Sequence, residues 1–228
     1  MNLFGVSIGR GGSSSPWCIL HFKMKSPTVH VAKFTISRLL VIGLLSFVAL
    51  SNSILRGAQL AFPGAEGFGR FSQGGRGGQV RFVTNLNDSG PGSLRAAVEA
   101  EGPRIVVFKI SGTIELQSKL RILNPRITVA GQSAPGDGIC LRRFPLNISA
   151  DDAVIRFLRV RLGDEAGKLM DGIDVSNAEN VMVDHCSVSW TLDEGVNTYH
   201  GSKNITIQWC LISEALHNSP LRNGHGFA

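Results

Sequence analysis

Short runs of β-branched residues recur along the second half of the chain. Successive runs start 27, 27 and 24 residues apart, at Ile127, Val154, Val181 and Ile205. Asn180 and Asn204 each stand directly before one of these runs. Self-similarity with a period of about 20 to 50 residues is the signature of stacked repeats, in which each unit buries its apolar side against the next. The spacing therefore predicts a solenoid.

A unit of about 25 residues has room for two or three strands of about five residues each. We therefore predict an all-β fold, a right-handed parallel β-helix whose neighbouring coils pair at about 4.8 Å. Cys186 and Cys210 occupy the same offset in two successive runs, which predicts an interior ladder of thiols. A disulfide between them is the less favoured alternative, because aligned parallel strands hold such side chains side by side.

The segment PGSLRAAVEAEG has the signals of a short helix. Ser93 is a typical N-cap residue, apolar residues follow on one face, and Gly102 with Pro103 would end the helix. The open end of a β-helix exposes unpaired strand groups. We therefore expect this short helix to cap the β-helix at its N-terminal end.

A glycine-rich segment lies at 64–78. It has neither the flanking strand and helix of a dinucleotide-binding fingerprint nor the Gly-Lys-Ser/Thr of a phosphate loop, since Arg76 follows Gly75. Nothing after Gly102 resembles a helix of about ten residues, which excludes a doubly wound α/β fold. We interpret the glycines as residues of tight turns.

The formal charge of +6 is confined to the N-terminal segment. Before Phe62 there are six basic residues and no acidic ones, so the remainder carries 17 charges of each sign. A nucleic-acid-binding domain keeps a basic patch on its folded part. We therefore exclude nucleic acid as a partner.

The same segment has the layout of a secretory signal. Basic residues precede the apolar run LLVIGLLSFVAL at 39–50, and the small polar residues SNS follow it. Twelve helical residues span about 18 Å, less than the hydrocarbon core of about 30 Å. We predict a leader at 1–61, with translation starting at Met24, and a secreted domain at 62–228. An uncleaved membrane anchor is the alternative.

Six longer segments carry a family resemblance. They are FPGAEGFG at 62–69, VTNLNDSGPGSLRAAV at 83–98, AGQSAPGDGI at 130–139, LRVRLGD at 158–164, VDHCSVSW at 183–190 and LDEGVNTY at 192–199. These segments resemble the secreted pectate lyases of the parallel β-helix polysaccharide lyase class. The resemblance implies cleavage of de-esterified polygalacturonate by β-elimination, with Ca²⁺ bridging the carboxylates of enzyme and substrate.

The resemblance also implies a calcium site on one face of the β-helix. It places ligands at Asp171 and, one coil later, at Asp193 and Asn197. Asp193 and Asn197 are four residues apart and would lie on the same side of an extended segment. Asn197 would stack beside Asp171, 26 residues earlier. Glu194 would point to the other side of such a strand, unless a turn brings it into the site.

Two departures from the family pattern concern these ligands. Many relatives have an acid at the position of Asn197, and the amide lowers the charge offered to calcium here. Some relatives carry a second acid where this chain has Leu169, a place that Asp164 or Glu165 would have to fill.

Other polar residues have their own interpretations. Asp184 and His185 are adjacent like a catalytic dyad, but in the resembling family this pair belongs to the wall of the coil. Lys168 and Arg222 are predicted to bind the anionic substrate. Arg222 lies in SPLRNGH, which resembles a substrate-groove loop.

No catalytic base is assigned within the chain. The resemblance implies that an arginine from a later segment removes the proton, and that residue would lie beyond Ala228. The chain ends in what resembles the middle of a coil, so we expect a fragment or a truncated gene product. Two hypotheses follow: a calcium-dependent pectate lyase, and a non-catalytic β-helix module that binds acidic polysaccharide. In both cases we expect a monomer whose partner is polygalacturonate.

Overall fold

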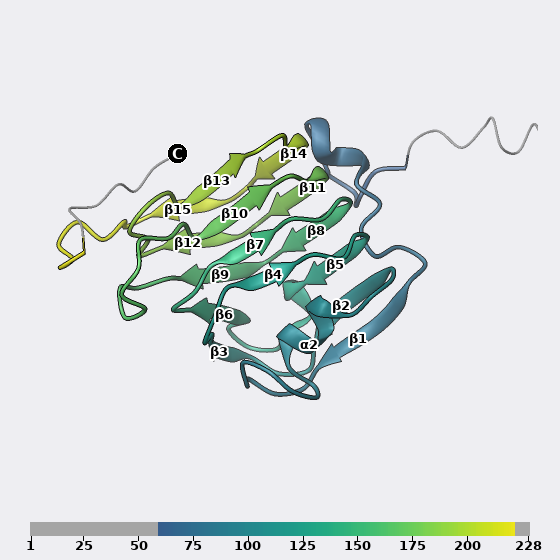
Figure 1. The fold of residues 1–228 in the computed structure, drawn as a ribbon. Helices are drawn as coiled ribbons and strands as arrows, with labels where there is room; N and C mark the ends of the chain where they lie inside the picture. Colours follow the sequence, from purple (N-terminus) through teal and green to yellow (C-terminus); the bar gives the residue numbers. More distant parts are fainter. Residues whose placement is uncertain (1–58, 222–228) are drawn as a thin grey trace, which may run out of the picture. The chain divides into compact units, whose positions relative to one another are not determined.

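The computed structural model describes residues 59–221, which form a stack of parallel strands wound into successive coils (Figure 1). The first sheet contains β1 (Gln79–Val83), β2 (Arg104–Phe108), β5 (Ile127–Ala130), β8 (Ala153–Arg156), β11 (Glu179–Asp184) and β14 (Lys203–Gln208), in that order. The second contains β3 (Gly112–Glu115), β6 (Ile139–Arg142), β9 (Leu158–Arg161), β12 (Ser187–Ser189) and β15 (Leu211–Ser213). The third contains β4 (Leu120–Ile122), β7 (Leu146–Ile148), β10 (Ile173–Ser176) and β13 (Val196–Tyr199).

From β2 to β13 the chain visits the first, second and third sheets in turn, so each of these four coils contributes one strand to each sheet. All pairings between these strands are parallel. The predicted all-β parallel β-helix is therefore confirmed.

Apolar side chains of successive coils stack inside the β-helix. In the first sheet Ile127 pairs with Ala153, Ala153 with Val181, and Val181 with Ile205. The first three of these residues are fully buried. Complete burial of a side chain the size of valine or isoleucine stabilises the fold by about 1.5–3 kcal/mol. The repeated apolar runs are thus the walls of one continuous core.

The predicted strand start at Val154 is wrong by one residue. Ala153, not Val154, stacks between Ile127 and Val181. Because Ala153 and its two successors are all apolar, the sequence does not mark which of them faces inward. Val154 packs instead with Met182 and Ala65 in a separate apolar cluster.

The glycine-rich segment packs against the first sheet, and its glycines do more than form tight turns. It includes a short 3₁₀ helix, η1 (Phe68–Phe71), that contacts β11 and β14. A Cβ added to Gly69 would lie 2.3 Å from the carbonyl oxygen of Val181, and one added to Gly75 would lie 1.8 Å from that of Arg104. Real Cβ atoms do not approach backbone this closely. These two glycines therefore allow the loop to contact the strands directly.

The predicted short helix is present as α2 (Leu94–Glu99). The Ser93 hydroxyl accepts a hydrogen bond from the backbone N–H of Ala96 at 3.2 Å, as expected of an N-cap. The helix ends at Glu99, three residues earlier than predicted from Gly102. Its buried face joins the main core, and it lies beside β1, β2 and β4 (Figure 1). Its role as a cap stays a prediction.

Helical structure is otherwise limited to single 3₁₀ turns in residues 59–221, namely η1 and η2 (Gly131–Ser133). None of these helices is long and apolar enough to cross a membrane. The predicted secretory run at 39–50 and the start at Met24 lie outside the described residues.

Asparagine with a positive φ recurs at equivalent positions of two successive coils. Asn180 and Asn204, with φ of 59° and 54°, are the second residues of β11 and β14 in the first sheet. The Asn204 side-chain amide donates to Asn180 Oδ1 at 3.0 Å. Asparagine tolerates the left-handed region better than most residues, which explains why it precedes two of the repeated runs.

Cys186 and Cys210 stand at matching positions in neighbouring coils. Both are free thiols, as is Cys140. Cys186 is buried in the core, and Cys210 is half-buried and packs against it. The predicted thiol ladder is therefore confirmed, and the disulfide alternative is not realised in this structure.

Candidate metal centre

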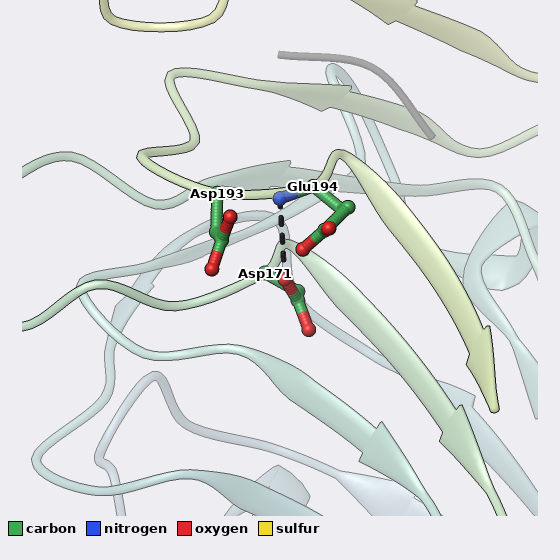
Figure 2. Close-up of side chains that lie close together, drawn as sticks. All are labelled: Asp171, Asp193 and Glu194. Atoms are coloured by element: carbon green, nitrogen blue, oxygen red, sulfur yellow. Dashed lines mark hydrogen bonds between the residues drawn. The ribbon is translucent and has the colours of Figure 1, made fainter. Parts of the chain in front are cut away.

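Three carboxylates gather where the chain enters the third sheet. Asp171 lies two residues before β10, and Asp193 and Glu194 lie just before β13. One oxygen from each of these side chains lies within 4.8 Å of the others, and all three residues are half-buried. Figure 2 shows the three side chains converging on one spot at the start of the two strands. We call Asp171, Asp193 and Glu194 the carboxylate cluster.

Backbone pairing holds the two acidic segments together. Ile173 pairs with Val196, and the Gly172 N–H donates to the carbonyl oxygen of Glu194 at 3.0 Å. The Glu194 N–H in turn donates to Asp171 Oδ1 at 3.2 Å, the bond drawn as a dashed line in Figure 2. Asp171 and Glu194 are therefore placed next to each other by the register of β10 and β13.

Gly172 is required by this close approach. A Cβ at this position would lie 2.7 Å from the carbonyl oxygen of Gly195 and 2.3 Å from a methyl carbon of Val188. The DG pair at 171–172 thus has a packing reason, because any larger residue would push the two acidic segments apart.

The predicted geometry of Asp193 and Asn197 is wrong. β13 begins only at Val196, and residues 192–195 are bent rather than extended. The bend brings Glu194 to Asp171, which was the alternative left open by the sequence. Four-residue spacing is informative only along a continuous strand, and the strand starts too late for it to apply here.

The predicted stacking of Asn197 on Asp171 is also wrong. The register partner of Asn197 is Asp174, because this coil spans 23 residues at the third sheet rather than 26. Asn197 nevertheless reaches the carboxylate cluster, since its side-chain amide donates to Asp171 Oδ2 at 3.4 Å.

Burial and the neighbouring acid raise the pKa of Asp171 to about 7. Loss of solvent is the larger cause, and the Glu194 carboxyl adds to it. Without a cation, the carboxylate cluster therefore holds a proton near neutral pH. A divalent cation would displace that proton and relieve the repulsion between the acids. Three closely spaced carboxylates beside an amide are the oxygen donors that a hard ion such as Ca²⁺ prefers, so these residues fit calcium.

Sequence reasoning missed a further acid, Asp174, which lies three residues after Asp171. Asp174 is 3% exposed, and its Oδ2 accepts from Asn147 at 2.8 Å and from the Tyr199 hydroxyl at 3.4 Å. Its Oδ1 is buried and has no hydrogen-bond partner in residues 59–221. The sequence did offer a signal, because Asp174 is an acid within the strand-like run IDVS. It pairs in register with Asn197 of the next coil.

The other predicted site residues have different surroundings. Lys168 is exposed in the loop before Asp171 and lines a hollow beside α2. Arg222 lies outside the described residues. Glu165 is paired with Arg142, and neither it nor Asp164 belongs to the carboxylate cluster. Neither Asp164 nor Glu165 therefore fills the place of the acid that some relatives carry at the position of Leu169.

Asp184 is the centre of a structural network. It is fully buried and accepts from Arg156 Nε at 2.7 Å, Gln208 Nε2 at 2.8 Å and His185 Nδ1 at 2.9 Å. Burial alone would raise the pKa of Asp184, but these hydrogen bonds hold it below its usual range. Gln208 also donates to the carbonyl oxygen of Gly64. These contacts favour a role for Asp184 in fastening the N-terminal loop to the coil wall.

Comparison with known proteins shows that this chain is similar in sequence to pectate lyases. A probable pectate lyase C of Emericella nidulans is 48% identical over 160 residues, covering 70% of this chain and 38% of the relative. A probable pectate lyase C of Aspergillus terreus is 44% identical over 176 residues, covering 77% and 41%. Probable pectate lyase 12 of Arabidopsis thaliana is 30% identical over 179 residues. The resemblance to pectate lyases expected from the sequence is therefore confirmed.

A solved structure supports the fold. The major cedar-pollen allergen jun a 1 matches with a TM-score of 0.54 and 24% identity, covering 62% of this chain and 46% of the allergen. No protein-family model matches the chain. The chain spans about two fifths of the length of the two fungal relatives described above.

Proposed function

We propose that this chain is a calcium-dependent pectate lyase, or the part of one that carries its metal centre. The observation that carries this proposal is the carboxylate cluster, positioned on a parallel β-helix in a chain that is similar to pectate lyases. The substrate would be de-esterified polygalacturonate, whose uronate groups are themselves ligands for a divalent cation.

The residues of the centre have two tasks in this proposal, to hold the cation and to orient one of its ligands. Asp171, Asp193 and Glu194 would hold the cation, and the Asn197 amide would orient the Asp171 carboxylate. A bound calcium ion supplies positive charge next to the carboxylate on which negative charge develops when the C5 proton leaves. The base that accepts this proton is not among the residues assigned here.

The activity is tested with the full chain and de-esterified polygalacturonate. We expect an unsaturated product that absorbs in the ultraviolet, and we expect a chelator to abolish its formation. Calcium-dependent retention of the polymer without product would favour the alternative of a non-catalytic polysaccharide-binding module. If the chain neither forms product nor retains the polymer in the presence of calcium, both functions are excluded.

We also propose that the protein is secreted as a monomer. The basic residues and the apolar run at 39–50 support export, with a membrane anchor as the alternative. The mass of the mature protein and its elution volume in gel filtration test these two proposals. An intact N-terminus in a membrane fraction would contradict secretion.

A further inference from the structure

A second charged feature lies beside the carboxylate cluster. A hollow of about 540 Å³ lies between α2 and the strands and loops of the third sheet. Residues that line it include Arg95, Lys119, Arg121, Phe144, Lys168 and Met170. We call this hollow the basic hollow.

Three of its cations have no counter-ion. Lys119, Arg121 and Lys168 are exposed, and their side chains form no ion pair or hydrogen bond with any residue in the range 59–221. The carboxylate of Glu99 in the same hollow lies 3.6 Å from Arg95 and is half exposed. Like charges brought together in one concave surface repel each other until an anion binds between them.

The fourth cation has a structural task. Arg95 pairs with Asp88 at 2.7 Å and donates to the carbonyl oxygens of Ser118 and Lys119, each at 3.0 Å. Its side chain is largely buried. Helix α2 therefore fixes the backbone that carries Lys119 and Arg121, so this wall of the basic hollow is formed before any ligand arrives.

The basic hollow and the carboxylate cluster lie along the same sheet. Arg121 pairs in register with Asn147, Asn147 with Asp174, and Asp174 with Asn197. Parallel strands are about 4.8 Å apart, so Arg121 lies about 10 Å along this face from Asp174. Met170, which lines the basic hollow, directly precedes Asp171. A linear polymer that runs across the strands of the third sheet would contact both features.

We propose that the basic hollow is a calcium-independent subsite for the carboxylates of an acidic polysaccharide. Lys119, Arg121 and Lys168 would each face a uronate carboxylate, and the partly buried ring of Phe144 would contact an apolar sugar face. The identity of the polymer rests on the proposed lyase function, whereas the recognition of uronate carboxylates rests on the hollow itself.

The test is calorimetric titration of the full chain with hexagalacturonate in EDTA at low salt. We expect binding that weakens as salt is added, and about tenfold weaker binding by the double variant Lys119→Gln/Arg121→Gln. The control variant Arg81→Gln/Lys203→Gln also removes two exposed cations, but neither residue lines the basic hollow. It should bind like the unmodified chain. Circular dichroism confirms that all variants are folded.

The outcomes separate this subsite from the lyase proposal. Loss of binding in the hollow variant alone supports the subsite, even if no calcium-dependent cleavage is found. Equal weakening in both double variants would show a general charge effect and overturn the proposal. So would equal affinity for methyl-esterified hexagalacturonate or for heparin, or the absence of binding in EDTA. Cleavage that depends on calcium but not on the basic hollow would leave the lyase function standing without this subsite.

Discussion

At the scale of single residues, Asp171 makes the stability of the metal-free protein depend on pH. Its pKa of about 7 in the folded state exceeds the value of about 4 in an unfolded chain. The folded state therefore binds more protons between pH 4 and 7, and its stability falls as pH rises through about this window.

The Asp171→Asn variant should lose this component of the pH dependence. We expect the Tm of the unmodified chain in EDTA to fall from about pH 4 to about pH 7, and the Tm of Asp171→Asn to fall less. Asp137→Asn, which changes an exposed acid, is the control. Parallel Tm curves for all three proteins, measured by calorimetry, would contradict the raised pKa of Asp171.

The individual ligands were only partly predictable from the sequence. Asp171 and Asp193 were candidates because the resemblance to pectate lyases places ligands there, and Glu194 was a candidate only if a turn brought it into the site. The detailed geometry depended on the bend at 192–195 before β13, and the sequence does not show that this bend turns Glu194 toward Asp171. Asp174 was missed because a buried acid within an apolar run resembles an ordinary strand position.

At the scale of secondary-structure elements, Gly172 couples the packing of β10 to the carboxylate cluster. We expect Gly172→Ala to lower the free energy of unfolding by about 1–3 kcal/mol, because its Cβ would press on Val188 and Gly195. It should also weaken calcium binding. The control Gly167→Ala lies in the same loop, where a Cβ meets no atom within 4 Å. It should cost stability through its positive φ of 65° but leave calcium affinity unchanged. Urea titration and calorimetry check both variants, and equal calcium affinities in the two would contradict this coupling.

The contact between the first sheet and the N-terminal loop depends on a buried ion pair. Arg156→Gln leaves Asp184 buried without its cation and should cost about 3 kcal/mol. Arg142→Gln breaks exposed pairs with Glu115 and Glu165 and should cost less than about 1 kcal/mol. Because the pKa of Asp184 is lowered in the folded state, its stabilisation is present above about pH 4 and is lost as pH falls further. Urea midpoints that match for the two variants would show that the Asp184 network contributes little.

At the scale of the whole molecule, the solenoid was predictable because one spacing is repeated several times. A parallel β-helix stacks equivalent positions, so a single period determines the fold class and the core. Contacts outside the repeat were less predictable. The glycine-rich loop binds the first sheet through the close approach of Gly69 and Gly75, and no local pattern encodes which strands they meet.

The carboxylate cluster and the basic hollow both lie along the third sheet, so one extended acidic polymer could contact both. The proposed lyase function depends above all on calcium binding by the carboxylate cluster. Calorimetric titration of the full chain with Ca²⁺ at pH 8 tests it most directly, with Asp171→Asn and Asp137→Asn compared side by side. We predict one binding site in the unmodified chain and in Asp137→Asn, and affinity at least about tenfold weaker in Asp171→Asn. Absence of calcium binding, or equal affinity in all three proteins, would contradict the claim.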